Sequence, residues 1–231
     1  KVAIIGGGPA GLAAAYHAQK HGLQATVFEK RETLGGIVRN VIPGFRIGDD
    51  AIDKDVALIR KTGAEFVMGK EAPDVKELKA MGFDYIVLAC GAEKKGRLNI
   101  EGNVMNVIDF LYAFKNGGEL KLGRNVAVVG GGNTAMDAAR AAKRAEGVEK
   151  VTLVYRRNRR YMPADLEELE LAIEDGVEFM ELVSPVKQAN GKLVCNKMKL
   201  GDKDASGRRV PVETGETVEV DADTVIAAVG E

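Results

Sequence analysis

VAIIGGGPAGLAAA, at residues 2–15, is the stretch that decides the fold of this chain. It begins with an apolar run that predicts a buried strand, and it continues through a glycine turn into an alanine-rich helix. The turn has the spacing G-x-G-x-x-G at Gly6, Gly8 and Gly11. In such a turn the first glycine permits the reversal, the second lets a pyrophosphate approach the backbone, and the third lets the helix pack on the strand. Pro9 suits the first helical turn, where a pyrophosphate would meet free N–H groups.

A second strand supplies the acidic residue that this kind of turn needs. The apolar run 25–28 ends at Glu29, which lies 23 residues after Gly6. A carboxylate at this position binds the ribose hydroxyls of an adenine dinucleotide. The alternative is a glycine-rich turn that binds nothing, but strand, spacing, helix and acidic residue seldom coincide. The stretch therefore predicts a dinucleotide site.

The same pattern returns in the second half of the chain. A strand over 124–129 runs into the turn GGGNTA at 130–135, with the spacing G-x-G-x-x-A, then a helix over 133–146 and a strand over 151–155. Repeated βαβ units predict an α/β fold of two tandem Rossmann-like domains with parallel sheets. A helix over 164–175 and a strand over 177–182 follow. Asn190-Gly191 predicts a hairpin in a small antiparallel excursion before a final strand at 223–230.

The residue after the second strand distinguishes the two predicted sites. Where the first domain places Glu29, the second places Arg156, which lies 26 residues after Gly130. A carboxylate there suits a free ribose hydroxyl, whereas an arginine accommodates a 2′-phosphate. The first site therefore suits FAD or NAD, and the second suits NADP. The alternative for the basic run 156–160 is a solvated loop, but its place directly after the strand favours the nucleotide.

The remaining elements are read from periodicity and from glycine and proline breaks. They place the domain boundary at a glycine-rich linker, so we expect domains at 1–118 and 119–231. The expected elements are a loop over 34–46, a helix over 50–62, a strand over 64–67, a helix over 74–81, a strand over 85–89, a helix over 107–115 and the linker 116–118.

Composition limits the function classes. The chain has 231 residues, of which 45% are hydrophobic and 29% charged, with a net charge of −1, and this balance argues against a dedicated nucleic-acid binder. The sequence contains no apolar run long enough to span a membrane and no signal peptide. Cys90 and Cys195 are its only cysteines, which predicts a cytoplasmic protein without a disulfide framework and excludes a C-x-x-C disulfide reductase. His17 and His21 lack a third ligand nearby, so no metal site is expected.

Both ends of the chain fall inside predicted strands, which predicts a piece of a longer protein. The first residue is Lys1, not Met, and it falls directly inside a strand, and the chain stops at the predicted strand over 223–230. We expect the first sheet to lack a closing strand and to hold FAD loosely. An unpaired sheet edge would also favour self-association.

Four stretches carry a resemblance to a known family: GGGPAGLAAA (6–15), LGGIVRNVIPGFRI (34–47), GGGNTAMDAAR (130–140) and VYRRNRRYMPA (154–164). With them, the chain resembles the flavin- and NADPH-binding part of the glutamate synthase small-subunit family. Its relatives include the corresponding part of dihydropyrimidine dehydrogenase and a selenate reductase-like branch, which the stretch 198–216 resembles most.

The resemblance implies FAD in the first domain, NADPH in the second, and iron–sulfur clusters in a partner domain or subunit. It implies a flavoprotein module that passes hydride from NADPH to FAD and electrons onward; the alternative is a cofactor-binding or assembly module without turnover. No side chain is predicted to be catalytic, because the cofactors carry the chemistry. The residues expected at the FAD site are Gly6, Gly8, Pro9, Ala10, Gly11, Glu29, Lys30, Gly36 and Arg39. Those expected at the NADPH site are Gly130, Gly132, Asn133, Thr134, Ala135, Arg156 and Arg157.

Overall fold

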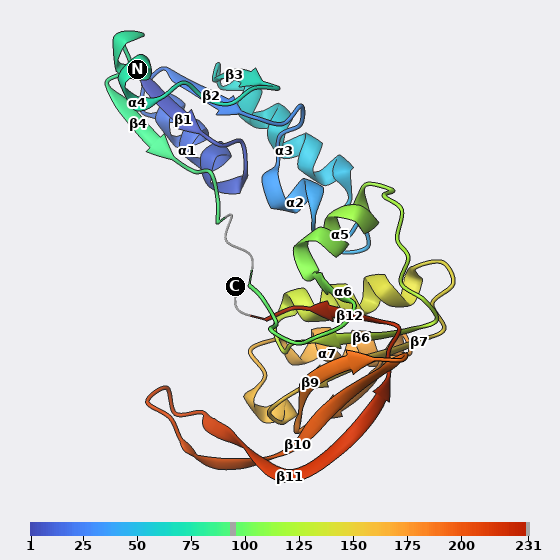
Figure 1. The fold of residues 1–231 in the computed structure, drawn as a ribbon. Helices are drawn as coiled ribbons and strands as arrows, with labels where there is room; N and C mark the ends of the chain where they lie inside the picture. Colours follow the sequence, from blue (N-terminus) through green and yellow to red (C-terminus); the bar gives the residue numbers. More distant parts are fainter. Residues whose placement is uncertain (93–95, 230–231) are drawn as a thin grey trace. The chain divides into compact units, whose positions relative to one another are not determined.

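A computed structural model describes residues 1–92 and 96–229 (Figure 1). The chain divides into two units, Lys1–Glu93 and Lys94–Glu231. Each unit is built on a parallel sheet with a glycine turn after its central strand. The prediction of two tandem Rossmann-like domains with parallel sheets and an antiparallel excursion is confirmed.

The first unit holds a four-stranded parallel sheet in the order β3-β2-β1-β4. Its strands are β1 (Val2–Ile5), β2 (Ala25–Glu29), β3 (Glu65–Met68) and β4 (Tyr85–Leu88), and its helices are α1 (Pro9–Lys20), α2 (Gly36–Asn40), α3 (Asp49–Lys61) and α4 (Val75–Ala80). Successive residues of β1 point to opposite faces of the sheet. Ile4 therefore packs with Leu12 of α1 and Ile52 of α3, whereas Ala3 packs with Leu78 of α4.

The second unit holds a five-stranded parallel sheet in the order β5-β12-β6-β7-β8. Its strands are β5 (Val104–Asn106), β6 (Asn125–Val129), β7 (Lys150–Tyr155), β8 (Glu178–Glu181) and β12 (Thr224–Ala227). The central part of this sheet repeats the order of the first sheet, with β6 in the place of β1. Three helices belong to it: α5 (Val107–Lys115), α6 (Asn133–Arg144) and α7 (Leu166–Glu174).

An antiparallel sheet covers one face of the second parallel sheet. It consists of β9 (Val183–Ala189), β10 (Lys192–Lys203) and β11 (Arg209–Asp221), in the order β11-β10-β9. Leu193 and Cys195 of β10 are fully buried and pack with Ala127 of β6 and Val225 of β12. Figure 1 shows β10 and β11 continuing beyond this core as a long two-stranded ribbon. The predicted hairpin at Asn190-Gly191 joins β9 to β10, and both residues have positive φ, as a tight hairpin turn requires.

The division between the units lies earlier in the chain than the predicted boundary at 118. β5, which the sequence did not predict, pairs in parallel with β12, so that Val104 lies opposite Val225. Residues 96–118 therefore belong to the second unit. The expected linker at 116–118 is a turn after α5, in which the Gly118 N–H donates to the carbonyl of Ala113 over 2.8 Å. The sequence could not show this, because a helical pattern does not say which sheet the helix joins.

The loop expected over 34–46 contains the short helix α2, so that prediction is wrong for Gly36–Asn40. The two glycines that suggested a loop provide the left-handed backbone before the helix, with φ of 117° at Gly35 and 56° at Gly36. The short 3-10 helix Arg159–Tyr161 was also not predicted. Gly230, expected in the last strand, lies outside the described residues.

Candidate functional site

The first glycine turn joins β1 to α1 in a geometry that only glycine permits at two positions. Gly6 has φ of 110°, and a Cβ placed on it would lie 2.3 Å from the carbonyl oxygen of Ala89. A Cβ on Gly11 would lie 1.9 Å from the carbonyl oxygen of Gly6. The reversal at Gly6 and the close packing of α1 on the turn therefore agree with the roles predicted for these residues.

A second backbone segment passes directly beside this turn. A Cβ on Gly36 would lie 2.8 Å from the Cα of Gly8, so the start of α2 rests against the start of α1. Gly8 caps α1 without a side-chain hydrogen bond, and Pro9 and Ala10 at its first turn are exposed. Unpaired helical N–H groups beside bare glycine backbone suit an anionic group such as a pyrophosphate.

Glu29 is buried at the end of β2, with 7% of its surface exposed. Its two carboxylate oxygens accept hydrogen bonds from backbone N–H groups, Oε2 from Gly7 over 2.7 Å and Oε1 from Arg31 over 2.8 Å. These bonds fix the carboxylate beside the glycine turn. Because each oxygen can accept more than one hydrogen bond, the side chain keeps acceptor capacity for ribose hydroxyls.

Two other predicted residues of the first unit have different surroundings. Arg39 donates from Nε to the carbonyl of Leu34 over 2.6 Å and forms an ion pair with Asp53 of α3. Its guanidinium therefore fastens α2 to α3, a local role that the sequence did not indicate. Lys30 is exposed next to Glu29.

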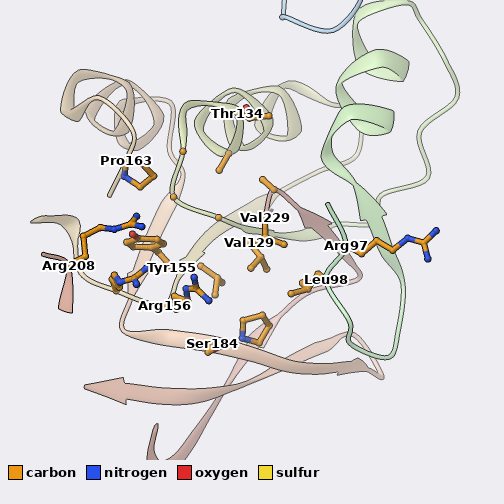
Figure 2. A pocket seen from close by; sticks show the side chains of 18 residues that line it. Arg97, Leu98, Val129, Thr134, Tyr155, Arg156, Pro163, Ser184, Arg208 and Val229 are labelled. Atoms are coloured by element: carbon orange, nitrogen blue, oxygen red, sulfur yellow. The ribbon is translucent and has the colours of Figure 1, made fainter. Parts of the chain in front are cut away.

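The second unit contains a cavity of about 620 Å³ at the end of β6 (Figure 2). The cavity collects six of the seven residues predicted for the second site, which are Gly130, Gly132, Thr134, Ala135, Arg156 and Arg157. Among the residues that the structure describes, no atom lies within 4 Å of a Cβ placed on Gly132, so this glycine faces the open cavity. Asn133 does not line the cavity. Its side-chain amide exchanges two hydrogen bonds with Asp165, from Nδ2 to Oδ2 over 3.1 Å and from the Asp165 N–H to Oδ1 over 3.0 Å.

The cavity wall is strongly basic. Four arginines line it, namely Arg97, Arg156, Arg157 and Arg208, and its lining within the described residues contains no aspartate or glutamate. Figure 2 shows Arg156 and Arg208 beside Tyr155 at one end, with Arg97 at the other. Such a wall suits a ligand with several negative charges.

Arg156 and Arg157 differ although they are neighbours. Arg156 is exposed, and within residues 1–92 and 96–229 no acidic side chain pairs with it. The side chain of Arg157 is only 9% exposed, and its Nη2 lies 3.6 Å from Oδ2 of Asp204. Its Nε donates to the carbonyl of Arg209 over 2.9 Å. Arg156 is therefore available to a ligand, whereas Arg157 also supports the ribbon of β10 and β11.

Sequence reasoning missed Tyr155, Arg208 and Arg97 at this site. Tyr155 ends β7 and is buried, and its hydroxyl donates to the carbonyl of Tyr161 over 2.7 Å. A Cβ on Gly131 would lie 2.3 Å from the Tyr155 ring, so the ring packs against the glycine turn. The extra glycine between Gly130 and Gly132 was the one available sign that a side chain packs on the turn here.

These features define a class of protein with two dinucleotide-binding domains of Rossmann type in one chain. The chain belongs to the pyridine nucleotide-disulphide oxidoreductase family, whose model matches residues 1–231.

Individual relatives refine this assignment. The chain is 47% identical to the oxidoreductase YgfK of Escherichia coli over all of its own length and 23% of that protein. It is 39% identical to the beta subunit of an NADPH-Fe(3+) oxidoreductase of Geobacter sulfurreducens, again over its whole length and 37% of the relative. It is 34% identical to the small chain of glutamate synthase [NADPH] of Escherichia coli, of which it covers 54%. The resemblance to the glutamate synthase small-subunit family is confirmed, and the chain spans from about a quarter to about half of these relatives.

A solved structure has the same fold. FprA of Mycobacterium tuberculosis, in complex with NADPH, superposes with a TM-score of 0.82 at 21% identity, over 99% of this chain and 70% of FprA. In the described part of the chain, none of the helices has the length and apolar character that crossing a membrane requires.

Proposed function

We propose that this chain is the FAD- and NADPH-binding module of a larger oxidoreductase, which takes hydride from NADPH and delivers electrons to iron–sulfur centres in a partner domain or subunit. The observation that carries the proposal is the cavity of the second unit. There a glycine turn, the start of α6 and four arginines converge, and no carboxylate lines the wall in the described ranges.

The second unit suits NADPH for two separable reasons. Gly132 leaves the start of α6 open, so that a pyrophosphate can meet the helix N-terminus and its dipole. Arg156 stands at the end of β7, where a guanidinium can form charge-assisted hydrogen bonds to a 2′-phosphate. NADH carries a hydroxyl there and gains nothing from the arginine. We therefore expect the module to prefer NADPH.

The first unit suits FAD. A Cβ on Gly36 would lie 2.8 Å from the Cα of Gly8, so two stretches of bare backbone lie side by side at the place where a pyrophosphate would bind. Glu29 presents a fixed carboxylate to the ribose. When bound, FAD supplies the chemistry that links two-electron to one-electron transfer. The residues of the chain hold and orient the nucleotides, and none needs to act as an acid or base.

Larger relatives support the idea of a partner. The names of two relatives include NADPH, and one of them also names Fe(3+). The chain spans only part of each of these relatives. We propose that the electron acceptor lies in a partner domain or subunit. Iron–sulfur centres are the acceptors that the family resemblance implies.

Disulfide chemistry, which the family name mentions, has no support in this chain. Cys195 is fully buried, and burial raises its pKa to about 11, so it remains a thiol at neutral pH. Cys90 is exposed, and 105 residues separate the two cysteines in the sequence.

The test is anaerobic reduction of the flavin. Protein reconstituted with FAD is mixed with NADPH, and absorbance near the flavin band is followed, with NADH as the comparison. Rapid bleaching by NADPH is expected. If FAD and NADPH both bind without bleaching, the chain is a cofactor-binding module without turnover, and the proposed hydride transfer is wrong.

A further inference from the structure

We propose that Arg208, from the turn between β10 and β11, is a specificity residue for the 2′-phosphate of NADPH. The inference rests on the proposed NADPH site and adds to it a contact from a remote part of the chain. Arg208 lies 52 residues after Arg156 in sequence, yet both line the same cavity. Figure 2 shows the two side chains at the same end, beside Tyr155 and Pro163.

The turn that carries Arg208 is ordered by its own hydrogen bonds. Asp204 Oδ1 accepts from the Ser206 hydroxyl over 2.6 Å, from the Ser206 N–H over 2.9 Å and from the Arg208 N–H over 3.1 Å. The backbone closes across the same turn, because the Asp204 N–H donates to the carbonyl of Arg208 over 2.8 Å. The hydroxyl of Ser206 contributes most to keeping the pKa of Asp204 below its ordinary value, so this acceptor stays ionised at neutral pH.

Arg157 fastens this turn to the nucleotide site. It follows β7 directly, and it reaches Asp204 with Nη2 and the carbonyl of Arg209 with Nε. The two residues that flank the turn are thereby held at the end of β7, where Arg156 stands. The ribbon is therefore positioned to bring a positive charge to the phosphate end of the cavity.

The guanidinium of Arg208 keeps donors for a ligand. Its Nε donates to the Ser206 hydroxyl over 3.1 Å, and its two terminal nitrogens make no hydrogen bond within the described ranges. A guanidinium held at Nε presents its remaining N–H groups in a fixed orientation, which is the arrangement that a phosphate recognises. Arg156 and Arg208 together would approach the 2′-phosphate from two different elements.

The experiment measures binding by calorimetry with two small probes, 2′,5′-ADP and 5′-AMP, which differ in carrying or lacking the 2′-phosphate. The variants are Arg208→Ala, Arg208→Lys and Arg156→Ala. Lys199→Ala is the matched control, because it removes one positive charge from the exposed side of the same ribbon without touching the cavity lining. Thermal melting accompanies each variant to show that the ribbon remains folded.

For Arg208→Ala we expect affinity for 2′,5′-ADP to fall about tenfold, with affinity for 5′-AMP unchanged, because hydrogen bonds to a charged group are lost only with the first probe. Arg208→Lys should retain part of the affinity that Arg208→Ala loses. Lys199→Ala should change the affinity for neither probe. If Arg156→Ala weakens the binding of 2′,5′-ADP and Arg208→Ala does not, the inference about Arg208 is overturned while the NADPH site stands. If Arg208→Ala weakens the binding of both probes equally, the inference is also overturned. If no variant affects 2′,5′-ADP, the proposed NADPH site itself fails.

Discussion

Replacing Arg156 and Arg157 one at a time should separate nucleotide recognition from the stability of the second unit. Arg156 is exposed and carries no ion pair in the described ranges, so Arg156→Ala removes only its contacts with a ligand. Hydrogen bonds between charged partners contribute about 1.5–3 kcal/mol, and exposure to solvent favours the lower end of that range. Since about 1.4 kcal/mol corresponds to a factor of ten, NADPH affinity should fall roughly tenfold while NADH affinity stays the same.

Arg157→Ala should behave differently, because the side chain is 9% exposed and donates to the carbonyl of Arg209. Losing this bond and its packing should cost about 1–3 kcal/mol of folding free energy. The melting temperature of the second unit should then fall on the order of 5 °C. Both nucleotides should bind more weakly, because the ribbon beside the cavity loses its anchor.

The assay combines calorimetric titration of NADPH and NADH with thermal melting of wild type and both variants. Arg159→Ala is a suitable control, since Arg159 is an exposed neighbour outside the cavity lining. The reasoning is refuted if Arg156→Ala lowers the melting temperature as much as Arg157→Ala, or if the wild type binds NADH as tightly as NADPH.

Three further outcomes are expected. Glu29→Gln should lower retention of FAD on gel filtration and destabilise the first unit by about 1–3 kcal/mol, because an amide NH₂ would face a backbone N–H; full retention would contradict it. Asp175 has its pKa lowered, first by a hydrogen bond from an arginine of α6, so its stabilising effect is present above about pH 4 and lost as pH falls through the folded-state pKa. The difference in unfolding free energy between wild type and Asp175→Asn should be constant from about pH 7 to 5 and should shrink below about pH 4 in urea titrations; a constant gap at all pH values would argue against the ion pair. Gly131→Ala should displace Tyr155 and destabilise the second unit by about 1–3 kcal/mol, whereas Gly132→Ala should leave melting unchanged and weaken NADPH binding; the reverse order would show that the turn is misread.

The bounds of several helices and strands were predictable because they depend on neighbouring residues in the sequence. The apolar run and the glycine and proline breaks placed the strand Val2–Ile5 and the start of α1 at Pro9, as the structure has them. The helix Val107–Lys115 was also placed to the residue. Its membership of the second unit was not, because it depends on the pairing of β5 with β12, strands that lie about half the chain apart.

Only those residues of the candidate site that the glycine pattern specifies were predictable from the sequence. The pattern names the turn, the first residues of the helix and the residue after the second strand, and in the second unit six of the seven residues it named line one cavity. It could not name Arg208, which enters from a hairpin whose position depends on long-range packing. Nor could it show that Asn133 pairs with Asp165. The sequence pattern of an asparagine at the start of a helix is the same whether its side chain binds a ligand or another part of the chain.

The position between the first two glycines of each pattern is treated as variable, yet both units place glycine there, and the reason is the same. The carbonyl of Gly7 accepts a hydrogen bond from the Gly35 N–H over 2.8 Å, and the carbonyl of Gly131 accepts one from the Ala164 N–H over 3.0 Å. In both units a segment that follows the second strand lies against the turn. A side chain leaves no room for a Cβ on this glycine, that of Leu34 in the first unit and that of Tyr155, which ends β7, in the second.

The two turns are similar, but the end of the neighbouring strand gives them different surroundings. In the first unit the segment that lies against the turn brings Gly36 against Gly8, so the turn is faced by bare backbone and by the carboxylate of Glu29. In the second unit the ring of Tyr155 at the end of β7 packs against the turn, and Arg156, the next residue, lines the cavity. The glycines suit the approach of a dinucleotide, and the residues at the end of the second strand, Glu29 and Arg156, determine the charge that it would meet. A change of nucleotide preference in either unit should therefore require a change at the end of the second strand and not in the turn.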